Sequence, residues 1–147
     1  MIDAIEREMY IDARIEHVWS LVSKAGFWVG NELHFDAVAG EGETVLIVTD
    51  AYGDFPVRVV TLDPPRYAAY RWASGYPGAQ LTEANSTLVE FTLVERDGGV
   101  LLQLRESGFA TLGGTLDFRA ARHLDNTTGW ESQLDRLRQI AERVPAR

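Results

Sequence analysis

The sequence predicts an α+β fold in which an antiparallel sheet packs against one long C-terminal helix. Two observations support this prediction. Between residues 33 and 106, runs typical of strands alternate with clusters of turn-forming glycine and proline. Near the C-terminus, apolar residues recur at i, i+4, i+7 and i+11, which places them on one face of a helix that must cover the sheet. These residues are Trp130, Leu134, Leu137, Ala141 and Val144.

The N-terminal residues predict a strand followed by a short helix. Apolar and polar side chains alternate from Ile5 to Ile11, the period of a half-buried strand, but Arg7 interrupts the apolar side. The period then changes to that of an amphipathic helix, and Asp12 is placed to cap its start. The apolar positions of this helix are Ile15, Val18, Trp19 and Val22.

The strand-like runs predict an antiparallel meander with one clear hairpin. Residues 87–95 and 100–106 are joined by Arg96-Asp-Gly-Gly, where glycine supplies the positive φ of a tight turn. On the solvent side of the sheet we expect Arg71, Glu90 and Arg105 to form a cross-strand charge ladder. Such a ladder is structural rather than catalytic.

The C-terminal helix contains two features besides its apolar stripe. Extending the stripe backwards reaches Thr127 and His123, which adds a polar pair next to Trp130. Gly129 costs about 1 kcal/mol in a helix interior relative to alanine, and close packing against a strand or ligand would compensate. Alternatively, residues 126–129 mark a helix start or a kink.

Charge and composition exclude several classes of partner. The 147 residues carry a formal net charge of −8, from 22 acidic and 14 basic side chains, which repels nucleic-acid phosphates. No stretch approaches the ~20 apolar residues of a membrane span, and the N-terminus lacks the pattern of a signal peptide. The chain has no cysteine. We therefore expect a cytoplasmic protein without a nucleic-acid partner, a membrane span or disulfides.

Recognisable catalytic and metal-binding motifs are absent from the sequence. His17, His34 and His123 lie far apart in different predicted elements, without an HExxH or CxxC motif. There is no nucleophile elbow, phosphate loop or dinucleotide fingerprint. We expect no metal and no cofactor, and we assign no catalytic residue.

Three polar residues are predicted on the apolar side of the sheet or helix: Arg7, Glu106 and His123. A buried charge without a partner is costly, so an inward Arg7 implies a carboxylate partner or access to solvent or ligand. Glu106 is the candidate carboxylate. The alternatives are a rim-exposed pair or an arginine that extends out of the core, and a core histidine at position 123.

Several motifs of the chain match those of a known family in order and spacing. They are residues 13–19, Asp63-Pro-Pro65, Tyr70-Arg-Trp72, the Gly99 hairpin, Ser107-Gly-Phe109 and Gly129-Trp130. With these motifs the chain resembles the SRPBCC, or START-like, superfamily, and within it the domains similar to the heat-shock protein 90 ATPase activator. The resemblance implies one helix-grip domain over residues 1–147, in which a curved sheet wraps around the C-terminal helix. It also makes the first and last strands neighbours, which would bring Arg7 and Glu106 together.

The resemblance further implies a cavity between the sheet and the C-terminal helix. We expect it to bind a hydrophobic or amphipathic small molecule, with Arg7 orienting an anionic or carbonyl group and Glu106 balancing the charge. The expected ligand-binding residues are Arg7, Met9, Phe35, Trp72, Phe91, Leu102, Leu104, Glu106, His123 and Trp130.

Two alternative functions remain open from the sequence. One is a cyclase- or hydrolase-like enzyme in which Glu106 or His123 moves a proton. The other is a co-chaperone-type protein-interaction module. A homodimer is also compatible with the sequence.

Overall fold

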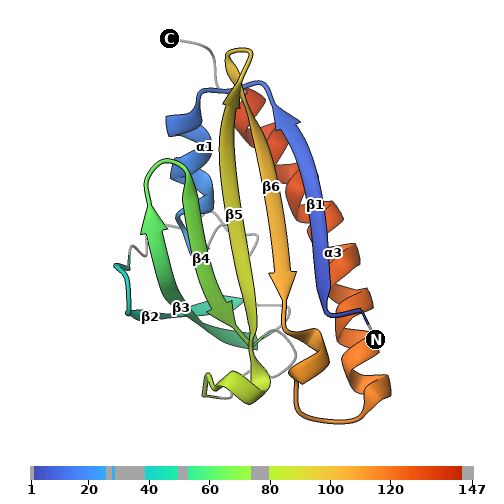
Figure 1. Ribbon diagram of the computed structural model, residues 1–147. Coiled ribbons are helices and arrows are strands. Elements are labelled where there is room, and N and C mark those ends of the chain that lie inside the picture. The colour runs from blue at the N-terminus through green and yellow to red at the C-terminus, as the bar shows by residue number, and fades with distance from the viewer. Residues whose placement is uncertain (1, 26–27, 29–38, 50–52, 74–79, 144–147) are drawn as a thin grey trace.

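The computed structural model describes residues 2–25, 28, 39–49, 53–73 and 80–143, and it confirms the α+β fold (Figure 1). The strands are β1 (Ala4–Ile11), β2 (Thr44–Thr49), β3 (Gly53–Asp63), β4 (Tyr67–Trp72), β5 (Thr87–Arg96) and β6 (Gly99–Ser107). The helices are α1 (Ile15–Val22) and α3 (Leu116–Arg143), with short 3-10 turns η1 (Glu83–Asn85) and η2 (Phe109–Thr111). The strands form an antiparallel sheet in the order β1-β6-β5-β4-β3-β2.

The predicted hairpin is formed by β5 and β6. Arg96 pairs with Gly99, and the two residues between them, Asp97 and Gly98, have φ values of 53° and 82°. Two positive φ angles in a two-residue loop match the right-handed twist of the flanking strands. A Cβ on Gly99 would lie 2.3 Å from the Tyr10 hydroxyl, so only glycine fits there.

The first and last strands are neighbours, as expected. β1 pairs with β6 along its whole length, with Ile5 opposite Glu106, Arg7 opposite Leu104 and Met9 opposite Leu102. Ile5 is buried and Met9 is half-buried against the core. The edge of the sheet formed by β1 is the part that α3 contacts most closely.

The short helix α1 buries one face against the sheet, but its predicted cap is wrong. Ile15 and Val18 are buried as the spacing predicts. Arg14, rather than Asp12, holds the N-cap position, and no side chain caps the helix. The Asp12 backbone N–H instead donates to the Glu142 carboxylate at 2.9 Å, which links the start of α1 to the end of α3.

The long helix α3 covers the sheet with its predicted stripe. Figure 1 shows α3 running along the β1 side of the sheet, behind its strands. Four stripe residues are buried: Trp130, Leu134, Leu137 and Ala141. The fifth, Val144, lies outside the described residues.

Gly129 lies inside α3, so the helix neither starts nor stops there. The expected close packing at this glycine is wrong, because a Cβ added to Gly129 would meet nothing within 4 Å. The residue faces solvent, and the structure gives no packing reason for its presence.

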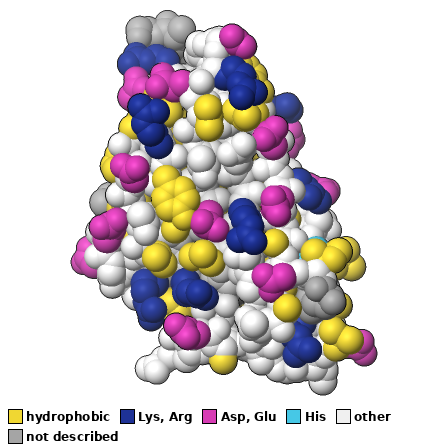
Figure 2. All heavy atoms as spheres, in the orientation of Figure 1, with side chains coloured by type: hydrophobic (Ala, Val, Ile, Leu, Met, Phe, Trp, Pro, Cys, Tyr) yellow, Lys and Arg dark blue, Asp and Glu magenta, His cyan; other side chains and the backbone are white. Residues whose placement is uncertain are grey.

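The outer surface mixes charges of both signs. Figure 2 shows basic and acidic side chains interspersed over the face of the sheet turned away from α3. Among the described residues, no helix combines the length and the apolar character needed to cross a bilayer.

Replacing Trp130 by alanine is expected to lower the free energy of unfolding by about 3–5 kcal/mol, the range for truncating a large buried aromatic side chain. Trp130 is 4% exposed, and its ring lies 5.7–5.8 Å from the rings of Trp28 and Phe91. Chemical denaturation measures the loss, with the exposed Leu124→Ala on the same helix as control. A loss below about 1 kcal/mol would contradict the orientation of α3 described above.

Replacing Gly129 by alanine is expected to raise the free energy of unfolding by about 0.5–1 kcal/mol, because alanine has the higher helix propensity and the added methyl group meets no obstacle. Gly108→Ala is the matched control and should destabilise, since Gly108 has a φ of 104°. Thermal or urea denaturation of both variants tests the pair; a destabilised Gly129→Ala would show that this turn of α3 depends on its glycine.

Candidate functional site

Glu106 is a fully buried carboxylate at the C-terminal end of β6. Alternation along this strand turns Val100, Leu102 and Leu104 towards the core, and Glu106 is the next residue in that series. Its exposed fraction is 0%. The sequence thus places an ionisable group where the pattern of the strand calls for an apolar one.

In the described part of the chain, four side chains donate hydrogen bonds to this carboxylate. The indole N–H groups of Trp72 and Trp130 donate at 2.9 and 2.7 Å, and the Thr87 hydroxyl donates to Oε2. The Asn126 amide reaches both oxygens, at 3.1 and 3.0 Å. Trp72 and Thr87 are register partners on β4 and β5, while Asn126 and Trp130 lie one turn apart on α3. Glu106 therefore joins three strands to the long helix.

Burial and hydrogen bonding have opposite effects on the pKa of the Glu106 carboxyl group. Burial raises the pKa of its carboxyl group above the usual value, and the bonds from Thr87, Trp130, Trp72 and Asn126 only partly oppose this shift. Indole and amide N–H groups can only donate, so they favour the ionised form. Among the described partners, Thr87 and, after rotation of its amide, Asn126 have an oxygen that can accept a bond from a protonated Glu106.

Aromatic rings surround this carboxylate on the core side. The Trp28 ring lies 5.1 Å from that of Tyr70, 5.4 Å from Trp72 and 5.7 Å from both Phe91 and Trp130. We call these five side chains the aromatic cluster. They come from β4, β5, α3 and the segment after α1, and Trp28 is 3% exposed. Trp28 thus contacts rings of both the sheet and α3, the two parts between which the resemblance implies a cavity.

The structure places most of the predicted ligand-binding residues on the inner side of the sheet. Phe91, Leu102, Leu104 and Trp130 are buried, and Met9 and Trp72 are partly buried against them. Phe35 lies outside the described residues. Whether these side chains bind a ligand stays a prediction.

The expected pairing of Arg7 with Glu106 is wrong. The Arg7 guanidinium lies 3.4 Å from the Glu131 carboxylate of α3, and it also donates to the Glu6 carbonyl. Its side chain is 39% exposed. Because β1 is an edge strand, a long side chain on its inner face can reach past the helix to solvent. Arg7 therefore lies at the rim of the core, and the partners of Glu106 in the described part of the chain are neutral.

His123 also lies apart from the carboxylate. Its Nε2 is 3.1 Å from the Ala4 carbonyl oxygen, and its ring packs edge-on against Phe109 at 5.1 Å. The Thr127 hydroxyl, expected beside it, donates to the His123 carbonyl. These contacts fit the reading of His123 as a core histidine.

Two residues of the site were not predicted from the sequence: Thr87 and Asn126. Asn126 lies one helical turn before Trp130, so a continuous α3 would have placed both side chains on the same face. Thr87 gives no signal of its own, because its position opposite Trp72 depends on strand register.

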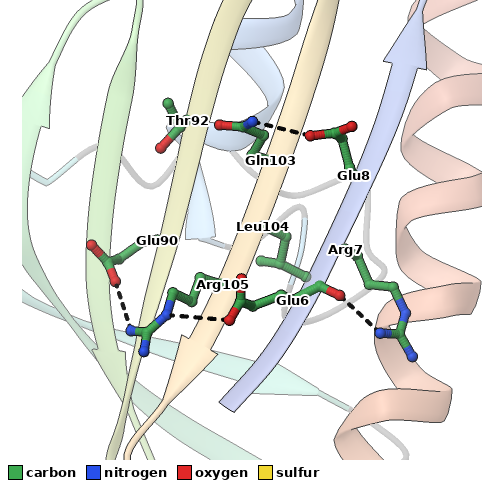
Figure 3. Close-up of a pocket in the computed structure, with 8 residues that line it drawn as sticks. All are labelled: Glu6, Arg7, Glu8, Glu90, Thr92, Gln103, Leu104 and Arg105. Carbon is green, nitrogen blue, oxygen red and sulfur yellow. Dashed lines mark hydrogen bonds and ion pairs between the residues drawn. The ribbon is translucent and has the colours of Figure 1, made fainter.

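A groove of about 470 Å³ lies on the outer face of the sheet, on the opposite side from Glu106 (Figure 3). Arg105 lies 3.6 Å from Glu90 and 3.9 Å from Glu6, while Arg71 bonds to Ser86 instead of joining this ladder. The ladder side chains are paired with one another and open to solvent, as in a structural charge ladder. Among the described residues, no three His, Asp or Glu side chains gather as metal ligands.

As pH rises from about 4.5 through the folded-state pKa of Glu106, the free energy of unfolding of the wild type should fall. It should fall more steeply than that of Glu106→Gln, which lacks the carboxyl group. A carboxyl group whose pKa is raised by folding contributes most to stability when protonated, and this contribution is lost as the folded form ionises. Urea denaturation of both proteins from pH 4 to 8 measures the difference. Parallel pH profiles of the two proteins would show that burial does not raise the pKa of Glu106.

Comparisons with known proteins agree with this geometry. A protein of Mesorhizobium loti has a crystal structure that matches with a TM-score of 0.73 and 21% identity, covering 97% of this chain and 99% of that one. The Aha1 dimer of Colwellia psychrerythraea, solved in solution, matches with a TM-score of 0.68 and 18% identity, over 97% and 98% of the two chains. A Bacillus halodurans protein is 26% identical, with a TM-score of 0.70 over 96% and 98%.

Residues 11–142 match the family described as Activator of Hsp90 ATPase homolog 1-like protein. No curated protein sequence matches the chain. The family match covers most of the chain, and the similar structures share its fold over nearly their whole length. The chain belongs to the Activator of Hsp90 ATPase homolog 1-like family, within the SRPBCC helix-grip superfamily.

Proposed function

We propose that the chain binds an amphipathic small molecule between the sheet and α3, with the polar group at Glu106 and the apolar body in the aromatic cluster. The observation that carries this proposal is the fully buried Glu106 carboxylate beside five aromatic rings. Apolar walls with a few converging polar groups are typical of small-molecule sites. The carboxylate would fix the orientation of the ligand, and the rings would supply most of the contact area.

Trp28 is the ring that a ligand would replace. Tyr70 and Trp72 lie on β4, Phe91 on β5 and Trp130 on α3, so four rings of the cluster are fixed by regular elements. Trp28 lies outside the sheet and α3, at a helical position between α1 and β2, and its ring contacts all four. Because Trp28 belongs neither to the sheet nor to α3, it is the ring whose displacement the proposal requires.

The size of the ligand follows from the contacts that Trp28 makes. A buried aromatic side chain covers roughly 150–250 Å² of surface. A ligand that displaces Trp28 must restore a comparable area, because otherwise the exposed rings would oppose binding. We therefore infer an apolar body at least as large as an indole.

An acid–base enzyme is the second candidate, and the raised pKa of Glu106 favours it. Catalysis of this kind needs a second polar group that converges on the same point. Among the described residues, the partners of Glu106 are neutral donors, and His123 is engaged by Ala4 and Phe109. Binding therefore explains the arrangement with fewer requirements. The homodimer and the cytoplasmic location stay predictions.

The proposal predicts that 3-propylindole, a neutral probe, shifts the indole N–H resonances of Trp72 and Trp130 but not that of Trp19. Trp72 and Trp130 donate to Glu106 and flank the cluster, whereas Trp19 is on α1 and has no ring contact with it among the described residues. Titration by ¹H–¹⁵N NMR measures both the shifts and the affinity. Native mass spectrometry of gently purified protein would show whether a molecule is already bound.

Trp28→Ala should bind the same probe about tenfold more tightly or better, since no ring has to leave the cluster first. Phe109→Ala is the matched control, because it removes a buried ring that packs on His123 instead. Equal affinities in both variants, or shifts of Trp19 alone, would contradict a site in the aromatic cluster.

A further inference from the structure

We infer that the ligand of this interior site carries a protonated amine next to its aromatic body, and that the ammonium group bonds to Glu106. The inference rests on the proposed function, and it concerns the sign of the charge that the site accepts. It replaces the expectation of an anionic or carbonyl group held by Arg7, because Arg7 is at the rim and paired with Glu131.

The first argument is the sign of the charge in the interior. Among the described residues, Glu106 is the carboxylate that accepts hydrogen bonds from two tryptophans of the cluster, Trp72 and Trp130, and its described partners are neutral donors. Tyr70, the other titratable side chain there, donates to the Val22 carbonyl, and burial raises its pKa, so it stays neutral. An anionic ligand would add a second negative charge without a cation, whereas an ammonium group would neutralise the first.

The second argument is the nature of the walls. The faces of aromatic rings attract cations, and tryptophan is the most effective. Trp28, Trp72 and Trp130 supply three indoles within 6.4 Å of one another. If the ligand body replaces the Trp28 ring, two indoles and Phe91 remain around the carboxylate. Such an arrangement compensates the desolvation of an ammonium group in two ways, by ring faces and by the opposite charge.

The third argument identifies the bond that the amine would replace. Glu106 accepts bonds from four side chains, so its lone pairs are occupied until one donor leaves. Asn126 makes the longest contacts, 3.0 and 3.1 Å, shared between both oxygens. It is also only partly buried, whereas Thr87 and Trp130 are buried. A charge-assisted bond from an ammonium group is roughly twice as strong as a neutral one, so it can take the place of the amide.

Three probes with one body and different charges test the inference: tryptamine, 3-propylindole and indole-3-propionate. The wild type should bind tryptamine about tenfold more tightly than 3-propylindole, and indole-3-propionate more weakly than either. Calorimetry gives the affinities, and the Trp72 and Trp130 N–H resonances show that each probe enters the cluster. Glu106→Gln should abolish the preference for tryptamine over 3-propylindole, because it removes the charge; glutamine also replaces one acceptor oxygen by an NH2 donor, so the two probes are compared within this variant.

A second measurement needs no variant at Glu106. The described groups that contact Glu106 (Trp72, Thr87, Asn126 and Trp130) do not titrate between pH 5 and 8. Tryptamine binding by the wild type should therefore strengthen as pH rises through the ionisation of Glu106, while 3-propylindole binding should not. Asn126→Ala should strengthen the binding of tryptamine relative to that of 3-propylindole, since it vacates the lone pairs that the amine would use.

The outcomes separate the two proposals. If 3-propylindole or indole-3-propionate enters the cluster as tightly as tryptamine, the cationic ligand is overturned and the interior binding site stands. If no probe shifts Trp72 and Trp130, both proposals fall. A preference for tryptamine that persists in Glu106→Gln would assign the selectivity to the rings alone and overturn the role of the carboxylate.

Discussion

The carboxylate of Glu106 is the interaction on which the arrangement of sheet and helix depends. It receives bonds from Trp72 on β4, Thr87 on β5, and Asn126 and Trp130 on α3, while Glu106 itself belongs to β6. An apolar stripe alone lets a helix slide or rotate on a sheet at small cost, because hydrophobic contacts have little direction. Hydrogen bonds have narrow tolerances in distance and angle. Two donors one turn apart on α3 therefore fix both the rotation and the height of the helix over the sheet.

This network is satisfied only as a whole. Four donors point at one group, so an apolar residue at position 106 would leave two indole N–H groups, a hydroxyl and an amide without an acceptor. Each unsatisfied buried donor costs about 1–3 kcal/mol. An interior without any of these polar groups would be as stable or more stable. The network thus adds specificity of packing rather than net stability, and it keeps an ionisable group in a dry aromatic environment.

The fold was predictable from the sequence wherever a local pattern has one physical explanation, such as burial of a helix face or a turn that requires positive φ angles. The stripe from Trp130 to Ala141 predicts the buried face of α3, and Asp97-Gly98 predicts a turn that requires two positive φ angles. Glu106 was recognised as an inward polar residue because it continues the series of Leu102 and Leu104. Its partners were not, because they depend on strand register and on the continuity of α3 through Gly129. Single-sequence patterns do not encode such distances.

Arg7 was assigned the wrong partner for a related reason. Electrostatics correctly requires a carboxylate near an inward arginine, and neighbouring strands made Glu106 the obvious choice. On an edge strand, however, a long side chain has a second route, around the helix to the solvent, and α3 presents Glu131 there. The exposed pair avoids the desolvation that a buried pair would have required. Among the described residues, the partners of the buried Glu106 carboxyl group are then neutral donors.

A group in that state responds to any charge that enters the interior. Fixed dipoles stabilise an ion without neutralising it, so the field of the carboxylate still reaches the neighbouring rings through a medium of low effective dielectric constant. A cation that arrives there gains more than it would at the surface, and it also favours the ionised form of Glu106. Stability and binding are therefore linked through one carboxyl group. The donors that hold α3 on the sheet are the same groups whose hydrogen bonds a ligand must keep or replace. Ligand binding in the interior therefore changes the hydrogen bonds between α3 and the sheet.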